Sequence, residues 1–146
     1  SSYWSDNIGL GAALTTIREL KRRNSEVRFK EIGEKLRKGL NAAFASAGLS
    51  GACTGLHTGP TVTIGLSDET LRPKVTTLFI QEMAKRHIHC YLSFKPTLAH
   101  TDEDVQRTTE AATEALRVVK RGLDRGDVDS LLECDVKKEP FRRLVR

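Results

Sequence analysis

The sequence has few aromatic residues and no long apolar run, and each shortage excludes a class of protein. Its 146 residues include five Phe, two Tyr and one Trp. Without a nucleic-acid motif beside them, so few aromatics argue against nucleic-acid binding. No apolar stretch approaches the roughly 20 residues of a membrane span, and no signal peptide is present. We therefore expect a soluble, cytoplasmic protein that binds neither nucleic acid nor membrane.

Cysteine is also scarce. Cys53, Cys90 and Cys134 are odd in number and widely spaced, which excludes a disulfide framework and favours free, mostly buried thiols in a reducing compartment. A chain of this length forms one ordinary domain that buries about two-thirds of the surface of its unfolded form. It needs neither a metal nor a disulfide to fold.

The positive charge is concentrated in one region. Residues 18–38 contain nine Lys or Arg and four Glu, a surplus equal to the net charge of +5 of the whole chain. Opposite charges recur there at i,i+4: Glu19 with Arg23, Glu31 with Lys35, and Glu34 with Lys38. Because this spacing pairs charges along a helix, the region is interpreted as a solvated helix face.

Periodicity predicts a small α+β sandwich of about four long helices on an antiparallel or mixed sheet of about three or four strands. The first helix is expected to begin after a cap at residue 5, 6 or 7 and to run to about Arg23, and the second to begin after a cap at residue 24 or 25 and to end at Gly48. Two more helices are expected from Pro73 and from Thr101 to about 121, and strands at 52–56, 60–66 and 87–93. The first two helices are joined by a short turn and should pack as neighbours. Residues 1–125 form the domain, and 126–146 are a weakly helical or loose tail.

Residues 87–105 organise the chain, because one continuous segment contains a strand, a polar crossing and a helix start. Apolar and polar residues alternate from 88 to 93, and Lys95-Pro96 then breaks the strand. Thr101 is a helix N-cap followed by acidic residues in the first turn. The expected strand is thus followed by a polar loop that leads into a well-capped helix.

No catalytic constellation or metal site follows from the residues. His87 and His89 would point to the opposite face of a strand from Cys90, whereas catalytic zinc needs three converging ligands. A pair of Cys53 with His57 lacks an orienting third group. No Gly-rich phosphate loop follows a strand. Because no autonomous site is found, the chain is interpreted as part of a larger protein or assembly.

Several segments occur in a family-like order. Ser-Ser-Tyr-Trp opens the chain, followed by ALTTIRELKRR in a Gly/Ala-rich helix, IGEKLRKGLNAA, short strands, and AHTDEDV at the last helix start. In this order the sequence resembles the C-terminal part of class III pyridoxal-phosphate (PLP) aminotransferases, especially the glutamate-1-semialdehyde aminomutase group. The resemblance covers about residues 1–124.

The resemblance implies the small domain of a fold-type I enzyme that packs against a large, PLP-binding domain of the same chain. The Schiff-base lysine and most cofactor contacts then lie upstream of Ser1, so no catalytic residue is expected here. PLP is expected in the parent protein and not on this chain alone. Partners implied are the large domain, an amino acid or amino-ketone substrate, and a second copy in a homodimer.

Few site residues carry over from the family. Its Ser-Thr-aromatic segment contacts the cofactor phosphate of the neighbouring subunit, and Ser2 is nearest that place, with Ser1 as the alternative. Lys95 is a candidate for binding a substrate carboxylate, and the simpler interpretation is a solvent-exposed lysine in a loop. His100 is expected to fasten the loop to the helix start.

Two functional hypotheses remain. In the first, the chain is the C-terminal domain of a PLP enzyme, aminotransferase or aminomutase, and is inactive alone because the lysine is missing. In the second, it is a stand-alone α+β interaction module that binds a protein partner through the exposed large-domain face. A domain separated from its parent should expose an apolar surface.

Overall fold

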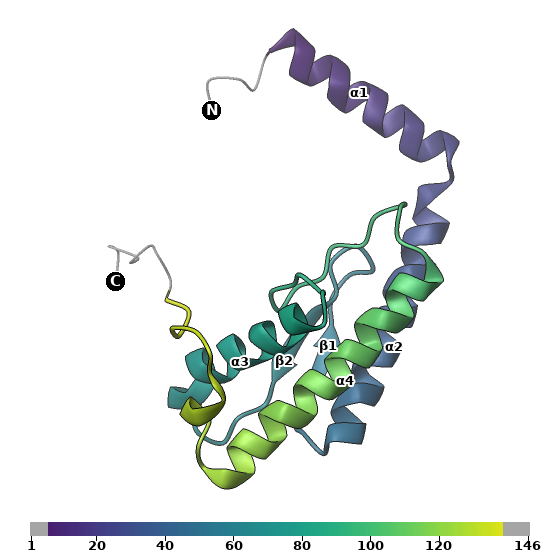
Figure 1. Cartoon of the computed structure of the whole chain (residues 1–146). Coiled ribbons are helices and arrows are strands. Elements are labelled where there is room, and N and C mark those ends of the chain that lie inside the picture. The colour runs from purple at the N-terminus through teal and green to yellow at the C-terminus, as the bar shows by residue number, and fades with distance from the viewer. Residues whose placement is uncertain (1–5, 139–146) are drawn as a thin grey trace.

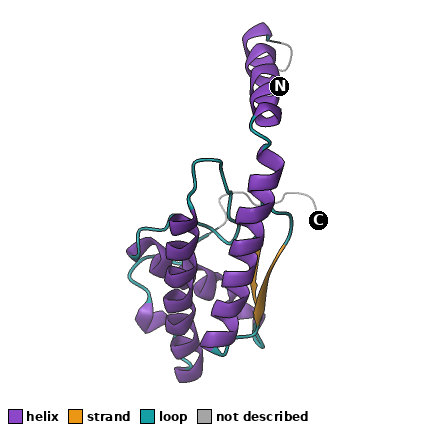
Figure 2. Ribbon diagram, turned by 90° about the vertical axis from the view of Figure 1, so that its right-hand side faces the viewer, coloured by secondary structure: helices purple, strands orange, loops and turns teal. Residues whose placement is uncertain are grey.

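The computed structural model describes residues 6–138. Its elements are α1 (Asn7–Arg22), α2 (Ser25–Ala47), β1 (Gly51–Thr54), β2 (Thr61–Ile64), a 3-10 turn (Glu69–Leu71), α3 (Arg72–Lys85), α4 (Asp102–Arg125) and a second 3-10 turn (Asp129–Leu131). Helices α2, α3 and α4 gather beside the β1–β2 hairpin (Figures 1 and 2). The predicted α+β class is therefore confirmed.

The two strands form the predicted hairpin around residues 57–59. They pair antiparallel, with Cys53 opposite Val62. Cys53, Val62 and Ile64 are buried, whereas Thr54 and Thr63 are exposed. This alternation is the period-two pattern of a sheet with one face on the core.

The segment predicted as a third strand forms an isolated bridge instead of a full ladder. Ser93 bridges to Thr61, the N–H of Val62 donates to the carbonyl of Leu92 at 2.7 Å, and the N–H of Phe94 donates to the carbonyl of Pro60 at 2.8 Å. Pro96, which follows closely, has no N–H to extend the pairing. The described sheet therefore has two strands with one bridged segment at the edge of β2.

The core lies where α2 and α4 pack against each other, the most extensive helix contact among the described elements. Leu40, Phe79 and Leu116 are almost fully buried in it. Gly39 allows a close approach, because a Cβ at this position would lie 2.3 Å from Cγ2 of Thr109. The two helices are thus held side by side by apolar packing and by one residue without a side chain.

Local signals place the helix ends as predicted. Gly48 ends α2 in the left-handed conformation, with φ 63°, which glycine adopts without a Cβ penalty. Proline occupies the first turn of α3. Thr101 and Asp104 form a reciprocal capping box at the start of α4.

The expectation that α1 packs against α2 is wrong. No residue of α1 is buried, and the helix stands clear of the other elements (Figures 1 and 2). Between the two helices Asn24 has φ 47°, a left-handed residue that redirects the chain. The hydroxyl of Ser25 donates to the carbonyl of Leu20 at 2.9 Å and closes the turn.

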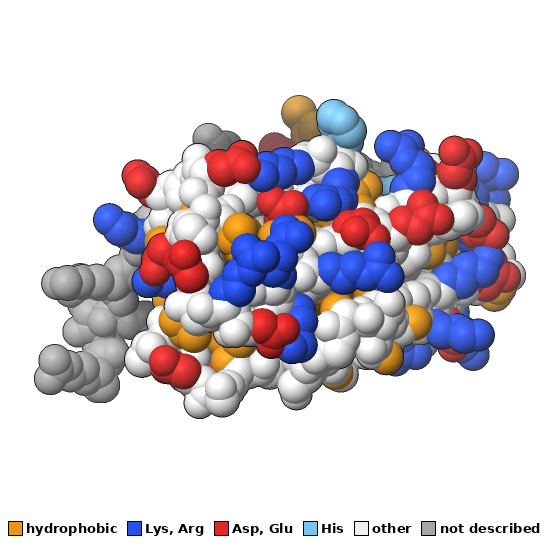
Figure 3. Space-filling view, turned by 60° about the horizontal axis from the view of Figure 1, so that its bottom comes forward, with side chains coloured by type: hydrophobic (Ala, Val, Ile, Leu, Met, Phe, Trp, Pro, Cys, Tyr) orange, Lys and Arg blue, Asp and Glu red, His pale blue; other side chains and the backbone are white. Residues whose placement is uncertain are grey.

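Acidic and basic side chains are interspersed on the face shown in Figure 3. The predicted pair of Glu19 with Arg23 forms at 2.5 Å. Lys35 pairs with Asp102 of α4 rather than with Glu31. Among residues 6–138, no helix combines the length and apolar character that a membrane crossing requires.

Replacing Leu40 with alanine should lower the free energy of unfolding by about 2–5 kcal/mol, because it leaves a cavity in the core. Leu14→Ala is the matched control: Leu14 is 47% exposed on α1, and we expect a change below about 0.5 kcal/mol. Urea unfolding of both variants measures the difference. A loss at Leu14 equal to that at Leu40 would mean that α1 is packed against the domain.

Candidate functional site

The loop of residues 87–101 begins with a histidine in a place that glycine usually takes. α3 ends in a Schellman motif, in which the N–H of His87 donates to the carbonyl of Ala84 at 2.9 Å and the N–H of Ile88 donates to that of Met83 at 3.0 Å. His87 has φ 62°. This left-handed conformation costs a residue with a Cβ about 1 kcal/mol.

The next residues alternate between the core and the surface. Cys90 and Phe94 are buried, while His89 and Tyr91 are exposed, with their rings edge to face at 6.0 Å. Burial raises the pKa of the Cys90 thiol to about 11 and also raises the pKa of Cys53. Both thiols are therefore protonated near neutral pH and are poor nucleophiles.

His100 ties the end of the loop to itself and to α2. The N–H of Thr97 donates to Nδ1 of His100 at 2.9 Å, and Nη2 of Arg28 donates to the carbonyl of His100 at 3.1 Å. The first bond closes the loop just before α4, and the second joins the loop to the N-terminal half of α2.

Asp102 connects the same two helices through charge. Its carboxylate accepts from Nζ of Lys35 at 2.5 Å and from Nη1 of Arg28 at 3.1 Å. These hydrogen bonds, first from Lys35 and then from Arg28, lower the pKa of the Asp102 carboxyl. The first turn of α4 is thereby held against α2.

A groove of about 500 Å³ lies between the loop, α2 and the first turns of α4. Its apolar lining comes from all three: Ile32 and Leu36 from α2, Phe94 from the loop and Val105 from α4. The volume is within the range of small-molecule sites, about 300–1,000 Å³.

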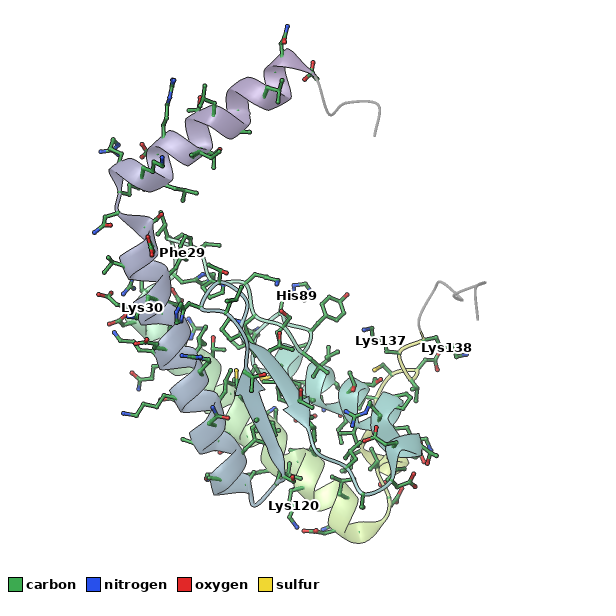
Figure 4. The ribbon with its side chains drawn as sticks, turned by 180° about the vertical axis from the view of Figure 1, so that it is seen from behind. Phe29, Lys30, His89, Lys120, Lys137 and Lys138 are labelled. Atoms are coloured by element: carbon green, nitrogen blue, oxygen red, sulfur yellow. The ribbon has the colours of Figure 1, made fainter. Side chains whose placement is uncertain are left out.

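Positive and imidazole side chains surround this apolar lining: His87, His89, Lys95, His100 and Arg107. Figure 4 shows His89 at the end of the domain opposite Lys120. Within residues 6–138, neither Lys95 nor Arg107 has a carboxylate at ion-pair distance.

Asp104 is the acidic residue of the lining, and it is already engaged. Its Oδ2 accepts from both the N–H and the hydroxyl of Thr101 at 2.8 Å. The backbone bond and then the side-chain bond from Thr101 lower the pKa of the Asp104 carboxyl. The groove therefore offers cations that form no ion pair among the described residues, while its carboxylate, still charged, makes its hydrogen bonds in the helix cap.

The residues predicted for a site fare differently. Lys95 lines the groove and is exposed, and its Nζ lies over the hairpin turn, 3.2 Å from where a Cβ on Gly59 would be. Ser1 and Ser2 lie outside the described residues. Sequence reasoning missed Arg107, since its position on α4 carries no signal beyond that of a solvated helix residue. It also missed the left-handed conformation of His87. The sequence signal for it was that no glycine occupies the position just after the cap of α3, where glycine is usual.

Residues 127–138 run back along α3. The amide of Gln81 donates to the carbonyl of Leu131 at 2.9 Å and accepts from the N–H of Glu133 at 2.7 Å. The N–H of Lys137 donates to the hydroxyl of Thr77 at 2.9 Å, and the Lys137 ammonium lies 4.8 Å from the Tyr91 ring centre. The segment thus connects α3 with the loop (Figure 4).

Within the described residues, no three His, Cys, Asp or Glu side chains form a metal-binding group.

No protein-family model and no curated protein sequence matches the chain. A solved structure, the PLP internal aldimine form of the FumI protein of Sphingopyxis sp. MTA144, is similar with a TM-score of 0.56 and 23% identity. The match covers 66% of this chain and 23% of that chain. The likeness shows a shared fold with part of a protein that carries PLP.

The groove does not fit PLP itself. A PLP site presents a lysine to the cofactor aldehyde and a charged partner to the pyridine nitrogen. Lys95 is exposed, and the Asp104 carboxylate is bound to Thr101. The groove therefore does not present the paired groups that would hold this cofactor.

Asp102→Asn should destabilise the fold near neutral pH, because it removes the charge that Lys35 and Arg28 bind. The pKa of Asp102 is depressed in the fold, so its contribution is present above the unfolded value near 4 and is lost as pH falls through the folded pKa. Urea unfolding at several pH values should show the variant approaching the wild type in acid.

Glu103→Gln is the control, since Glu103 is an exposed neighbour without an ion pair among the described residues. An equal, pH-independent loss in both variants would contradict the role of Asp102.

Proposed function

We propose that this chain is the C-terminal small domain of a PLP-dependent enzyme that transfers or shifts an amino group. Two observations support the proposal: the fold shared with part of the PLP-carrying FumI chain, and the class III aminotransferase-like order of segments in the sequence. The second favours an aminotransferase or a glutamate-1-semialdehyde aminomutase-like enzyme, acting on an amino acid or amino-ketone.

The surface of α1 supports a missing neighbour. Leu10, Leu14 and Ile17 share one side of the helix at i,i+4 and i,i+3 spacing, and they are 54%, 47% and 52% exposed. An apolar stripe of this kind is normally covered in the working protein. In the proposal the large domain covers it, with a homodimer as a further arrangement.

The proposed division of labour follows from the residues present. PLP, held by the large domain, supplies the electron sink for chemistry at the amino carbon. This chain supplies one wall, in which the 87–101 loop is held by His100 and by the α4 cap. Ser1 or Ser2 would contact the cofactor phosphate of the neighbouring subunit, and Lys95 would meet a substrate carboxylate.

The stand-alone interaction module is the second candidate, and the same exposed stripe on α1 favours it. In that case a protein partner of another chain covers Leu10, Leu14 and Ile17. The two candidates differ in what precedes Ser1 in the gene. A lysine-bearing large domain in the upstream reading frame supports the enzyme, and a start codon directly before Ser1 supports the module.

Titrating the 146-residue chain with PLP should give no saturable visible absorbance and no turnover with an amino donor, because the groups that hold PLP are absent. Lys95→Ala tests the groove lysine, and we expect its spectrum to equal that of the wild type. Stoichiometric imine formation or turnover by the wild type would contradict the claim that this chain alone is inactive, and its loss in Lys95→Ala would assign the imine to Lys95.

A further inference from the structure

We propose that the groove between the 87–101 loop, α2 and α4 binds a small organic anion, one that carries a carboxylate or phosphate on an apolar group. The groove shares Lys95 and the 87–101 loop with the substrate wall proposed above, so the proposal deepens that function, but binding to the groove needs no PLP. The groove is built wholly from this chain, whereas the cofactor lysine would belong to the missing domain.

Charge defines the head group of the ligand. Lys95 and Arg107 reach the lining from the loop and from α4, and no carboxylate of residues 6–138 lies within ion-pair distance of either. The one acid of the lining, Asp104, keeps its negative charge and acts on Arg107 through space, but its hydrogen bonds go to Thr101. The ammonium and guanidinium donors are therefore open to an anionic ligand, since charge-assisted hydrogen bonds are strong and guanidinium matches carboxylate and phosphate geometry.

The lining between these cations defines the rest of the ligand. Ile32, Leu36, Phe94 and Val105 supply apolar contacts, which an inorganic ion would leave unused. The cavity of about 500 Å³ has room for a ring or a short chain beside the charged group. The ligand is therefore an organic anion rather than a simple ion.

The strain at His87 is an independent observation that points to the same place. Glycine would adopt φ 62° without a Cβ penalty, and the bonds to Ala84 and Met83 are backbone bonds that glycine would keep. The chain instead has a histidine, and this residue lines the groove. A non-glycine residue held in the left-handed region beside a groove supports a role of its side chain in contacting a ligand.

The experiment titrates the whole 146-residue chain with phenyl phosphate, benzoate and benzyl alcohol at fixed ionic strength, and follows backbone amide shifts by NMR. We expect at least one of the two anions to shift amides of residues 87–96 and 104–108 in a saturable way. Neutral benzyl alcohol should bind at least about tenfold more weakly, because it offers no charge to Lys95 and Arg107. Binding of only one anion supports the proposal and identifies the head group.

Matched variants separate the groove from general charge. Lys95→Ala with Arg107→Ala should weaken anion binding at least about tenfold. Lys38→Ala with Arg121→Ala removes the same charge from exposed positions of α2 and α4 outside the groove, and should change affinity less than about twofold. Equal losses in the two double variants would overturn the proposal, as would the absence of shifts with both anions, or benzyl alcohol binding as tightly as they do.

His87→Gly tests the strained residue without threatening the fold. The variant should keep or raise Tm, because glycine suits the left-handed position, yet bind the anion at least about threefold more weakly, through loss of one side-chain contact. An affinity equal to that of the wild type would overturn the role of His87. These results are independent of PLP, so failure here leaves the proposed enzyme standing, and imine formation by this chain leaves the groove standing.

Discussion

The packing of α2 against α4 is the contact on which the rest of the described structure depends. Leu40 and Leu116 are buried there, and Gly39 lets the helices approach closely. The groove has its lining on both helices, so it exists only while they stay side by side. Asp102, at the start of α4, adds ion pairs to Arg28 and Lys35 of α2 at the end of the helix pair that borders the groove.

At that end of the helix pair, the residues that stabilise the fold differ from the residues proposed to contact a ligand in the groove. Thr101 and Asp104 satisfy each other in the helix cap, so the hydrogen bonds of this acid go to the cap and not to Lys95 or Arg107. His87 does the reverse, since it holds a left-handed conformation that glycine would hold more easily. Locally unfavourable choices of this kind are expected where a protein binds something, because selection there acts on the contact and not on the fold.

Helix α1 leaves an apolar surface of the described chain uncovered. Its apolar stripe has no partner within the described residues, and the left-handed Asn24 directs it away from α2. Under the proposed function, the large domain covers this stripe. The comparison with part of the FumI chain shows a shared fold.

The sequence by itself determined the local structure: the end of α2 at Gly48, the start of α3 at Pro73, the cap at Thr101 and the hairpin turn. Each of these depends on neighbours within a few residues, so its signal is legible in the chain. Only the tertiary structure decided that α1 stands apart, that Ser93 forms a single bridge, and that Lys95 and Arg107 line one groove. Those outcomes rest on contacts between distant segments, and periodicity tells which side of an element is apolar without telling what will cover it.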